Sequence, residues 1–275
     1  MRLSDTHTHT RFSTDSKAEP AELLSAASAQ GLSYLCFTDH MDLDFPGDAT
    51  QFVFDTDQYF RELLPLKEQT KGKKTSLLIG IEMGLRPGRP DLRAQIDTLL
   101  SEKPYDFVLG STHIVDEMDP YELEYWSFSG DRLLRYFETV YENTKEHTNF
   151  DSLAHLDYII RYMPEKEGFV RDYRVADYEN LLEETLRLIA TRGQALELNT
   201  AGLRKGLPFV HPKKELLLRF KELGGEYVTL GSDAHAAKDV GADIKTAAEV
   251  LHSCGYSGYT VYKERKPMVL PLSAT

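Results

Sequence analysis

The chain has 275 residues, of which 41% are hydrophobic and 28% are charged, and its formal net charge is -12. This length is typical of one large α/β domain or two modest ones, with enough apolar residues for a sizeable core. The negative charge disfavours binding to nucleic acid or to an anionic membrane. No apolar stretch approaches the roughly 20 residues that span a bilayer, and the start lacks a leader pattern. We therefore expect a cytoplasmic protein.

Short apolar runs alternate with longer amphipathic runs along the chain. The short runs are rich in β-forming residues and predict strands over 2–7, 34–40, 76–85, 106–113, 152–160, 195–200 and 227–235. The amphipathic runs predict helices over 20–31, 57–69, 91–103, 131–147, 176–193, 212–225 and 244–255. This alternation predicts parallel strands joined by right-handed crossovers, in a closed barrel or an open doubly wound sheet. Because no linker or internal repeat divides the chain, we expect one domain over residues 1–275.

A histidine pair lies in the first predicted strand. His7 and His9 are one residue apart, so an extended strand points both imidazoles to the same side. Two neutral imidazoles held in this way can share a metal ion, since imidazole binds zinc, iron and manganese well. A chance HTH in a polar tail is the alternative, so the pair needs support from elsewhere in the chain.

That support comes from the ends of the other predicted strands. His40, Glu82, His113 and His155 lie at or near the ends of four successive strands, Asp233 and His235 end the last one, and Asp15 follows the first. The carboxyl ends of parallel strands open onto one face of a barrel or a doubly wound sheet, and active-site residues gather on that face. We therefore expect these groups to meet in one cleft.

The remaining histidines serve as an internal control. His147 ends a predicted helix, His211 precedes a proline in a loop and His252 lies in a helix, all without carboxylate or histidine partners at strand ends. We expect these three to be surface or capping residues. Histidine does not favour strands, so its concentration at strand ends points to a joint metal site.

The number of candidate ligands predicts more than one metal ion. A catalytic zinc uses about three protein ligands, so nine groups fit three ions. Imidazole and carboxylate ligands without thiolate suit zinc, manganese or iron, and Cys36 and Cys254 look like isolated thiols. Three divalent cations would outweigh the charge of Asp15, Glu82 and Asp233. The site would then be positive enough to bind a phosphate ester in an acidic protein.

The ordered set of motifs resembles the PHP superfamily, named for polymerase and histidinol phosphatase. The motifs are HxH, a following Asp, DH, a Glu in the third strand, STH, AH and SDAH, in a match from Met1 to about Ala236. Chain length and the stretch ELNTAGLRKG resemble the stand-alone histidinol-phosphate phosphatases of histidine biosynthesis. The resemblance implies a distorted (β/α)7 barrel, a trinuclear metal centre and hydrolysis of L-histidinol phosphate to L-histidinol and phosphate.

The resemblance also implies which residues share each ion. The first would be held by His7, His9, Glu82 and Asp233. Glu82 would bridge to a second ion held by His113 and His155, and Asp15, His40 and His235 would hold the third. A hydroxide bound to the metals held by His7, His9, Glu82 and Asp233 would then attack phosphorus in line, because bridging cations bring the pKa of water toward neutrality.

Other polar side chains follow the later strands. Arg161 and Arg204 could bind phosphate with bidentate geometry, or could be solvated loop residues. Asn199 could contact substrate or could cap a turn. Six acidic residues have similar alternatives: Asp5, Asp39 and Asp157 could orient the ring N–H groups of ligand histidines, and Asp116, Glu117 and Asp119 could meet a cationic part of the substrate.

Two other functions remain open. A metal-dependent exonuclease or other phosphodiesterase, or another small-molecule phosphatase, could use the same scaffold, although the net charge of -12 disfavours a nucleic-acid strand. A non-catalytic metal-binding protein would keep the ligands without an open coordination position. We expect a small-molecule phosphate ester as partner, and neither nucleic acid nor membrane; the sequence leaves the oligomeric state open.

Overall fold

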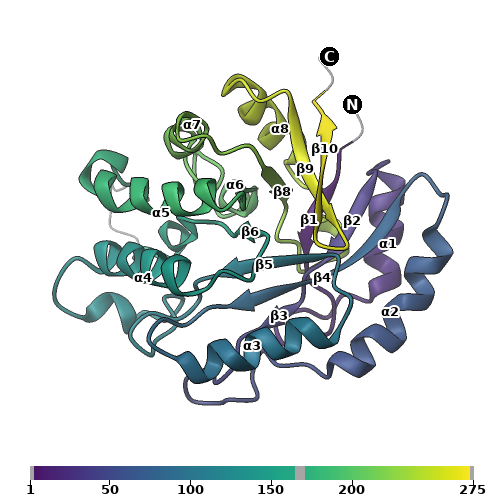
Figure 1. Ribbon diagram of the computed structural model, residues 1–275, viewed down its shortest axis with the longest axis horizontal. Helices are drawn as coiled ribbons and strands as arrows, with labels where there is room; N and C mark the ends of the chain where they lie inside the picture. The colour runs from purple at the N-terminus through teal and green to yellow at the C-terminus, as the bar shows by residue number, and fades with distance from the viewer. Residues whose placement is uncertain (1–2, 165–170, 273–275) are drawn as a thin grey trace.

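A parallel sheet forms the centre of the fold (Figure 1). The computed structural model describes residues 3–164 and 171–272. The strands are β1 (Asp5–Thr8), β2 (Tyr34–Phe37), β3 (His40–Met41), β4 (Ser76–Gly84), β5 (Phe107–Ser111), β6 (Ser152–Leu153), β7 (Ala195–Asn199) and β8 (Val228–Gly231). They are paired in the order β1-β2-β4-β5-β6-β7-β8, and β3 continues the path of β2 beside β4. Each predicted strand run overlaps one of these strands, although β3, which begins at the last residue of the run 34–40, was not predicted as a separate strand.

The first and last strands of the sheet meet and close it into a barrel. The amide of His9 donates to the carbonyl of Ala234 over 2.8 Å, and the amide of Asp233 donates to the carbonyl of His7 over 2.8 Å. Of the two predicted arrangements, the closed barrel is therefore the one that the chain forms. Closure also brings the start of the chain beside residues more than 220 positions away, which the site requires.

Helices cover the outside of the strands (Figure 1). They are α1 (Pro20–Ala29), α2 (Thr56–Thr70), α3 (Pro90–Glu102), α4 (Arg132–Glu146), α5 (Glu179–Thr191), α6 (Ala201–Arg204), α7 (Lys214–Glu222) and α8 (Ile244–Ser253). The side chain of Asp131 caps α4 by accepting from the amides of Leu133 and Leu134, and buried Leu133 and Phe137 mark its inner face. No helix within the described residues is both long and apolar enough to cross a bilayer.

The fifth predicted strand is the main difference from the expected elements. The run 152–160 was predicted as one strand, but only Ser152 and Leu153 pair, and the chain then turns into the short 3-10 helix η2 (Tyr158–Tyr162). Asp157 lies at this turn and accepts a hydrogen bond from the amide of Lys213 over 2.9 Å. The amide of His155, two residues past β6, donates to the Glu197 carboxylate over 2.8 Å rather than to a neighbouring strand. Buried polar partners therefore outweigh the β-forming preference of this sequence.

A C-terminal hairpin was not predicted. Strands β9 (Gly258–Lys263) and β10 (Lys266–Pro271) pair antiparallel, although prolines at both ends of β10 weaken its strand signal. At the hairpin turn, the Arg265 amide donates to the Asp106 carbonyl over 2.9 Å, and its guanidinium contacts the Asp151 carboxylate at 2.5 Å. Because Asp106 and Asp151 precede β5 and β6, the hairpin covers the amino ends of the strands, leaving the opposite end open for a site.

Candidate metal centre

All nine predicted ligands lie together at the carboxyl ends of the strands. Four groups of side chains there bring their nitrogen and oxygen atoms within 4.8 Å of one another: His9, His40 and His235; His7, His9 and Asp233; His7, Glu82 and His155; and His40, Asp42 and His113. Asp15 adjoins the first of these groups through His235, because Asp15 Oδ2 lies 3.0 Å from His235 Nε2. Residues from opposite ends of the chain therefore converge, as the barrel topology predicts.

The most deeply buried group surrounds one carboxylate oxygen of Glu82. Glu82 Oε2 lies 3.2 Å from His7 Nε2 and 3.4 Å from His9 Nε2. Asp233 completes the group with Oδ1 at 3.3 Å from His9 Nε2. The backbone of Asp233 is left-handed, with φ of 56°, a strained conformation for a non-glycine residue and one that is often found at functional sites.

The other oxygen of Glu82 faces a second pair of imidazoles. Glu82 Oε1 lies 3.1 Å from His113 Nε2 and 3.0 Å from His155 Nε2. The two oxygens of one carboxylate thus serve two separate donor groups. This is the arrangement in which a carboxylate can bridge two cations.

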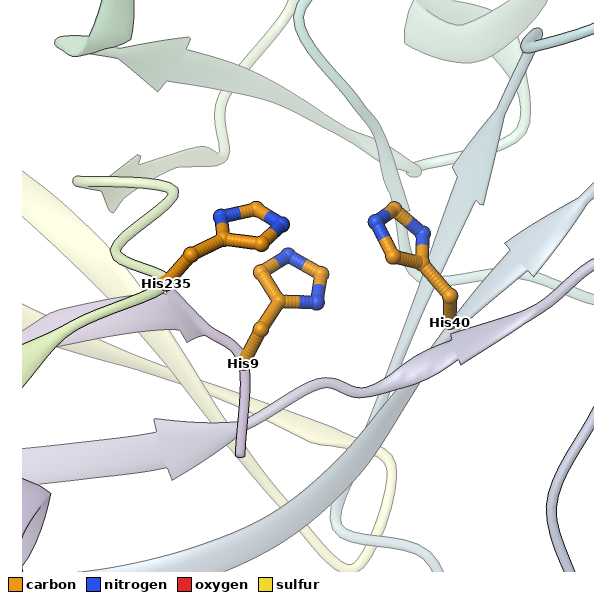
Figure 2. A group of neighbouring side chains, drawn as sticks. All are labelled: His9, His40 and His235. Carbon is orange, nitrogen blue, oxygen red and sulfur yellow. The ribbon is translucent and has the colours of Figure 1, made fainter. Parts of the chain in front are cut away.

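A third group lies nearer the mouth of the site. Asp15 Oδ2 is 3.0 Å from His235 Nε2 and 3.8 Å from His40 Nε2. Figure 2 shows the rings of His9, His40 and His235 gathered around one space, with ring centroids 4.2 Å apart for His9 and His40 and 4.1 Å apart for His9 and His235. The Asp15 side chain is 42% exposed, whereas Glu82 is fully buried, so the groups run from the interior to the surface.

Buried polar atoms without hydrogen bonds indicate that this donor set fits metal ions. Glu82 Oε2 and His40 Nδ1 are 3.0 Å apart, yet neither has a hydrogen-bond partner. Leaving a buried carboxylate oxygen and a buried imidazole nitrogen unpaired costs free energy. Metal ions bound in the cluster would satisfy these atoms, and imidazole with carboxylate is the ligand chemistry of zinc, manganese and iron.

The pKa shifts of the clustered side chains also indicate a site for positive charge. Burial alone would raise the pKa of the Glu82 carboxyl, but the imidazoles of His7 and His40 hold that pKa well below its usual range. Burial likewise opposes protonation of His40, yet Glu82 beside it raises the pKa of the imidazole to about 9. Burial and neighbouring His235 lower the pKa of His9 well below its usual range, so His9 is in the neutral form that binds metals. The cluster is therefore built to hold positive charge.

Two carboxylates behind the ligands were not predicted from the sequence. Glu197 Oε1 lies 2.6 Å from His7 Nδ1, and Asp42 Oδ1 lies 2.8 Å from His113 Nδ1. A carboxylate on the outer ring nitrogen orients a ligand histidine and makes it a better donor. A Cβ on Gly231 would lie 2.3 Å from Glu197 Oε1, so glycine is needed for this approach. The signal in the sequence was the charge of Glu197 inside the strand run ALELN, every residue of which is buried.

The three aspartates predicted to orient ligand rings have other partners. Asp5 accepts from the amides of Ser232 and Gly241, and therefore ties together chain segments rather than orienting a ring. Asp39 accepts from the Ser13 hydroxyl over 2.9 Å, and Ser13 in turn contacts His9 Nδ1. Asp157 does contact a ring nitrogen, but it belongs to a histidine outside the predicted ligand set. Its Oδ1 lies 2.6 Å from His211 Nδ1.

The control histidines follow the prediction only in part. His252 is exposed, as expected. His147 is 3% exposed and is the C-cap residue of α4, so the capping alternative is confirmed for it. His211 is fully buried, so the expectation was wrong for this residue. His147 Nε2 lies 3.1 Å from the Arg86 carbonyl, and His211 is paired with Asp157. The structure therefore assigns both to internal hydrogen bonding away from the ligand cluster.

A cavity of about 940 Å³ opens over the cluster. Asp15, His40, His113, His155, Asp233 and His235 line it, together with both predicted arginines. Arg161 Nη1 donates to Asp233 Oδ2 over 2.9 Å, and Arg204 Nη2 donates to the Asp233 carbonyl over 3.2 Å. Burial opposes the charge on Arg161, but Tyr162 and Asp233 raise the pKa of its guanidinium, so it stays cationic.

Asn199 is not among the residues that line this cavity. The side chain is fully buried, its Oδ1 accepts from the amide of Ala201 over 2.9 Å, and its Nδ2 donates to Glu197 over 3.2 Å. This placement matches the turn-capping alternative rather than the expected substrate contact. Asn199 supports the site by holding Glu197 behind His7.

Comparison with known proteins identifies the family. The PHP domain matches residues 5–201, which is most of the chain. The chain belongs to the PHP domain family. The matched span of this PHP domain contains His7, Glu82 and His155 and ends before Asp233, the residue that barrel closure brings to the same cluster.

Relatives of this PHP domain are similar over almost their whole length. A protein named probable histidinol-phosphatase from Clostridium acetobutylicum is 34% identical over 91% of this chain and 93% of its own. Histidinol-phosphatase from Lactococcus lactis is 32% identical over 97% and 98%. A crystal structure of histidinol phosphate phosphatase from Lactococcus lactis, complexed with zinc, L-histidinol and phosphate, is similar with a TM-score of 0.87 and 30% identity, covering 97% and 99%. The expected PHP-type barrel is confirmed.

Proposed function

We propose that this chain is a metal-dependent phosphomonoesterase that hydrolyses L-histidinol phosphate to L-histidinol and phosphate in histidine biosynthesis. The observation that carries the proposal is the placement of Glu82, whose two oxygens face separate donor groups below a cavity that also contains Arg161 and Arg204. The full-length similarity to histidinol-phosphatases supports the choice of substrate.

The metal ligands belong to the same proposal. His7, His9, Glu82 and Asp233 hold one divalent ion, Glu82 with His113 and His155 holds a second, and Asp15, His40 and His235 hold a third. Zinc is a suitable ion because the similar structure from Lactococcus lactis contains it. Manganese and iron suit the same imidazole and carboxylate ligands. When bound, such ions lower the pKa of a coordinated water and stabilise negative charge on phosphoryl oxygens.

The arginines bind and orient the phosphate group. Both guanidiniums converge on Asp233, so they present N–H donors on the same side of the ligand cluster. The rings of Tyr158 and Tyr162 pack against Arg161, with centroids 5.1 Å and 4.9 Å from its guanidinium carbon. A guanidinium held in this way loses little conformational freedom when it binds the two oxygens of a phosphate.

The acidic rim of the cavity disfavours a nucleic-acid substrate. Glu117, Glu122 and Glu124 line the opening and would repel the phosphates that flank a scissile diester. A small zwitterionic ester carries its negative charge at one end only, and that end can reach the cations. The geometry therefore favours the monoester over the phosphodiester alternative.

Phosphate release from a panel of esters tests the proposal. The panel contains L-histidinol phosphate, sugar phosphates, nucleoside monophosphates and a phosphodiester, each with the purified protein before chelation, after chelation and after metal is added back. We expect the highest kcat/KM for L-histidinol phosphate, loss of activity with chelator and recovery with metal. Preference for another ester, or release that is insensitive to chelation, would contradict the proposal.

A further inference from the structure

The loop after β5 supplies one wall of the cavity and carries five carboxylates, of which Asp116, Glu117 and Asp119 come first. Glu117 and Asp119 line the cavity, and Asp116 is adjacent to them in the chain. The phosphate-binding arginines and the ligand cluster line other parts of the same cavity. A bound phosphate ester would therefore have the rest of its molecule near this loop.

Ion pairs distinguish the three carboxylates. Asp116 contacts the guanidiniums of Arg135 at 2.9 Å and Arg132 at 3.3 Å. Glu117 is paired with Arg86. Within residues 3–164 and 171–272, Asp119 has no ion-pair partner. Of these three, Asp119 can accept a cation from a ligand without first losing one. Glu122 and Glu124, which follow in the loop and also line the cavity, are exposed, whereas Asp119 is half-buried.

The surroundings of Asp119 suit an ammonium group. Its Oδ1 accepts from the amide of Tyr121 over 2.8 Å, which fixes the direction of the carboxylate. The side chain is half-buried, and burial, with the nearby charge of Asp42, raises the pKa of its carboxyl. Tyr158 and Tyr162 lie near Asp119, whose charge is one cause of the raised pKa of both phenols. Their rings can contact the methylene groups beside an ammonium.

We propose that Asp119 is the residue that selects an amine-bearing substrate, by accepting a hydrogen bond from the ammonium group next to the phosphorylated carbon chain. This inference rests on the proposed function and deepens it, because it assigns recognition of the amine to one carboxylate. The ammonium would form an ion pair with the partly desolvated carboxylate of Asp119. An ester without the amine would leave that carboxylate unpaired.

The test compares two esters that differ only in the amine. L-Histidinol phosphate and its deamino analogue, 3-(imidazol-4-yl)propyl phosphate, are turned over by the holoenzyme and by Asp119→Asn. We expect the unmodified protein to prefer L-histidinol phosphate in kcat/KM by about 10- to 100-fold, the usual range for a hydrogen bond to a charged group, and the variant to lose most of that preference.

Two controls separate recognition from damage to the loop. Glu184→Gln replaces an exposed carboxylate outside the cavity and should keep the full preference. Metal content of Asp119→Asn should match that of the unmodified protein. An unchanged ratio between the two esters in Asp119→Asn would overturn this inference while leaving the proposed function in place. Failure of the unmodified protein to hydrolyse L-histidinol phosphate would overturn both.

Discussion

Arg161 and Asp233 are joined by their side chains, with Nη1 donating to Oδ2 over 2.9 Å. The other oxygen of the same carboxylate faces the imidazole of His9 at 3.3 Å. One aspartate therefore connects a candidate phosphate-binding arginine to the candidate metal centre. Burial would raise the pKa of the Asp233 carboxyl, but Arg161 and His9 hold it well below its usual range, so both contacts are made by the anion.

Replacing Arg161 should weaken substrate binding more than metal binding. Arg161→Ala removes the guanidinium, while the proposed metal ligand Asp233 retains its contacts with His7 and His9. We expect KM for a phosphate monoester to rise about 10- to 100-fold, since a charge-assisted hydrogen bond is worth about 1.5–3 kcal/mol. Steady-state kinetics with metal analysis measures both effects. Arg174, whose side chain is 80% exposed, provides a control substitution without effect. Unchanged KM and kcat in Arg161→Ala would remove this residue from the site.

Replacing Glu82 should remove more than one ion. Glu82→Gln keeps the size of the side chain but loses the charge that faces both His7 and His113. Because both donor groups share this carboxylate, we expect metal to be lost from two positions, with activity falling below one hundredth of the original. Elemental analysis of the purified variant gives the metal content. Full occupancy would contradict the bridging role.

Replacing Glu197 should weaken metal binding without abolishing it. Glu197 contacts the outer nitrogen of His7 at 2.6 Å, so Glu197→Gln leaves every proposed ligand in place. Loss of such a contact typically lowers metal affinity 10- to 100-fold. Competition with a chromophoric chelator measures this affinity, and excess metal should restore full occupancy, unlike in Glu82→Gln. An affinity equal to that of the control Glu184→Gln, an exposed glutamate, would argue against the orienting role.

The buried pair of His211 and Asp157 should contribute to stability. His211→Ala removes a ring that contacts the Asp157 carboxylate at 2.6 Å and leaves a cavity beside it. We expect the free energy of unfolding to fall by roughly 2–4 kcal/mol, from the lost hydrogen bond and the lost packing. Urea unfolding at a fixed metal concentration measures this change. His252→Ala, at an exposed histidine, should stay within about 0.5 kcal/mol. Equal stability of the two variants would show that the buried pair contributes little.

The ligand cluster was predictable because it follows from strand ends. Each parallel strand was recognisable from its apolar run, and the carboxyl ends of such strands share one face. His40 and His113 could therefore be placed together although 72 other residues separate them, and the structure does place them together, with ring centroids 5.1 Å apart. Barrel closure was one of two alternatives, because strand alternation alone does not fix which strands form the edges.

The supporting contacts were less predictable, because they depend on packing in three dimensions. Glu197 lies behind His7 only where Gly231 lets the strands approach, and no local pattern in the sequence gives that distance. The loop position of His211 before a proline suggested exposure, yet a partner 54 positions away buries it. The fifth strand also ends earlier than its β-forming residues indicate, since the His155 amide donates to Glu197 rather than to a neighbouring strand.

Metal stoichiometry of the purified chain tests the central claim most directly. The claim is that three groups of imidazole and carboxylate side chains around Glu82 each hold one divalent ion. The protein is first supplied with zinc, manganese or iron and then dialysed against a metal-free buffer. We expect inductively coupled plasma analysis to find three ions per chain. Fewer than three ions per chain under saturating supply of each metal would contradict the claim.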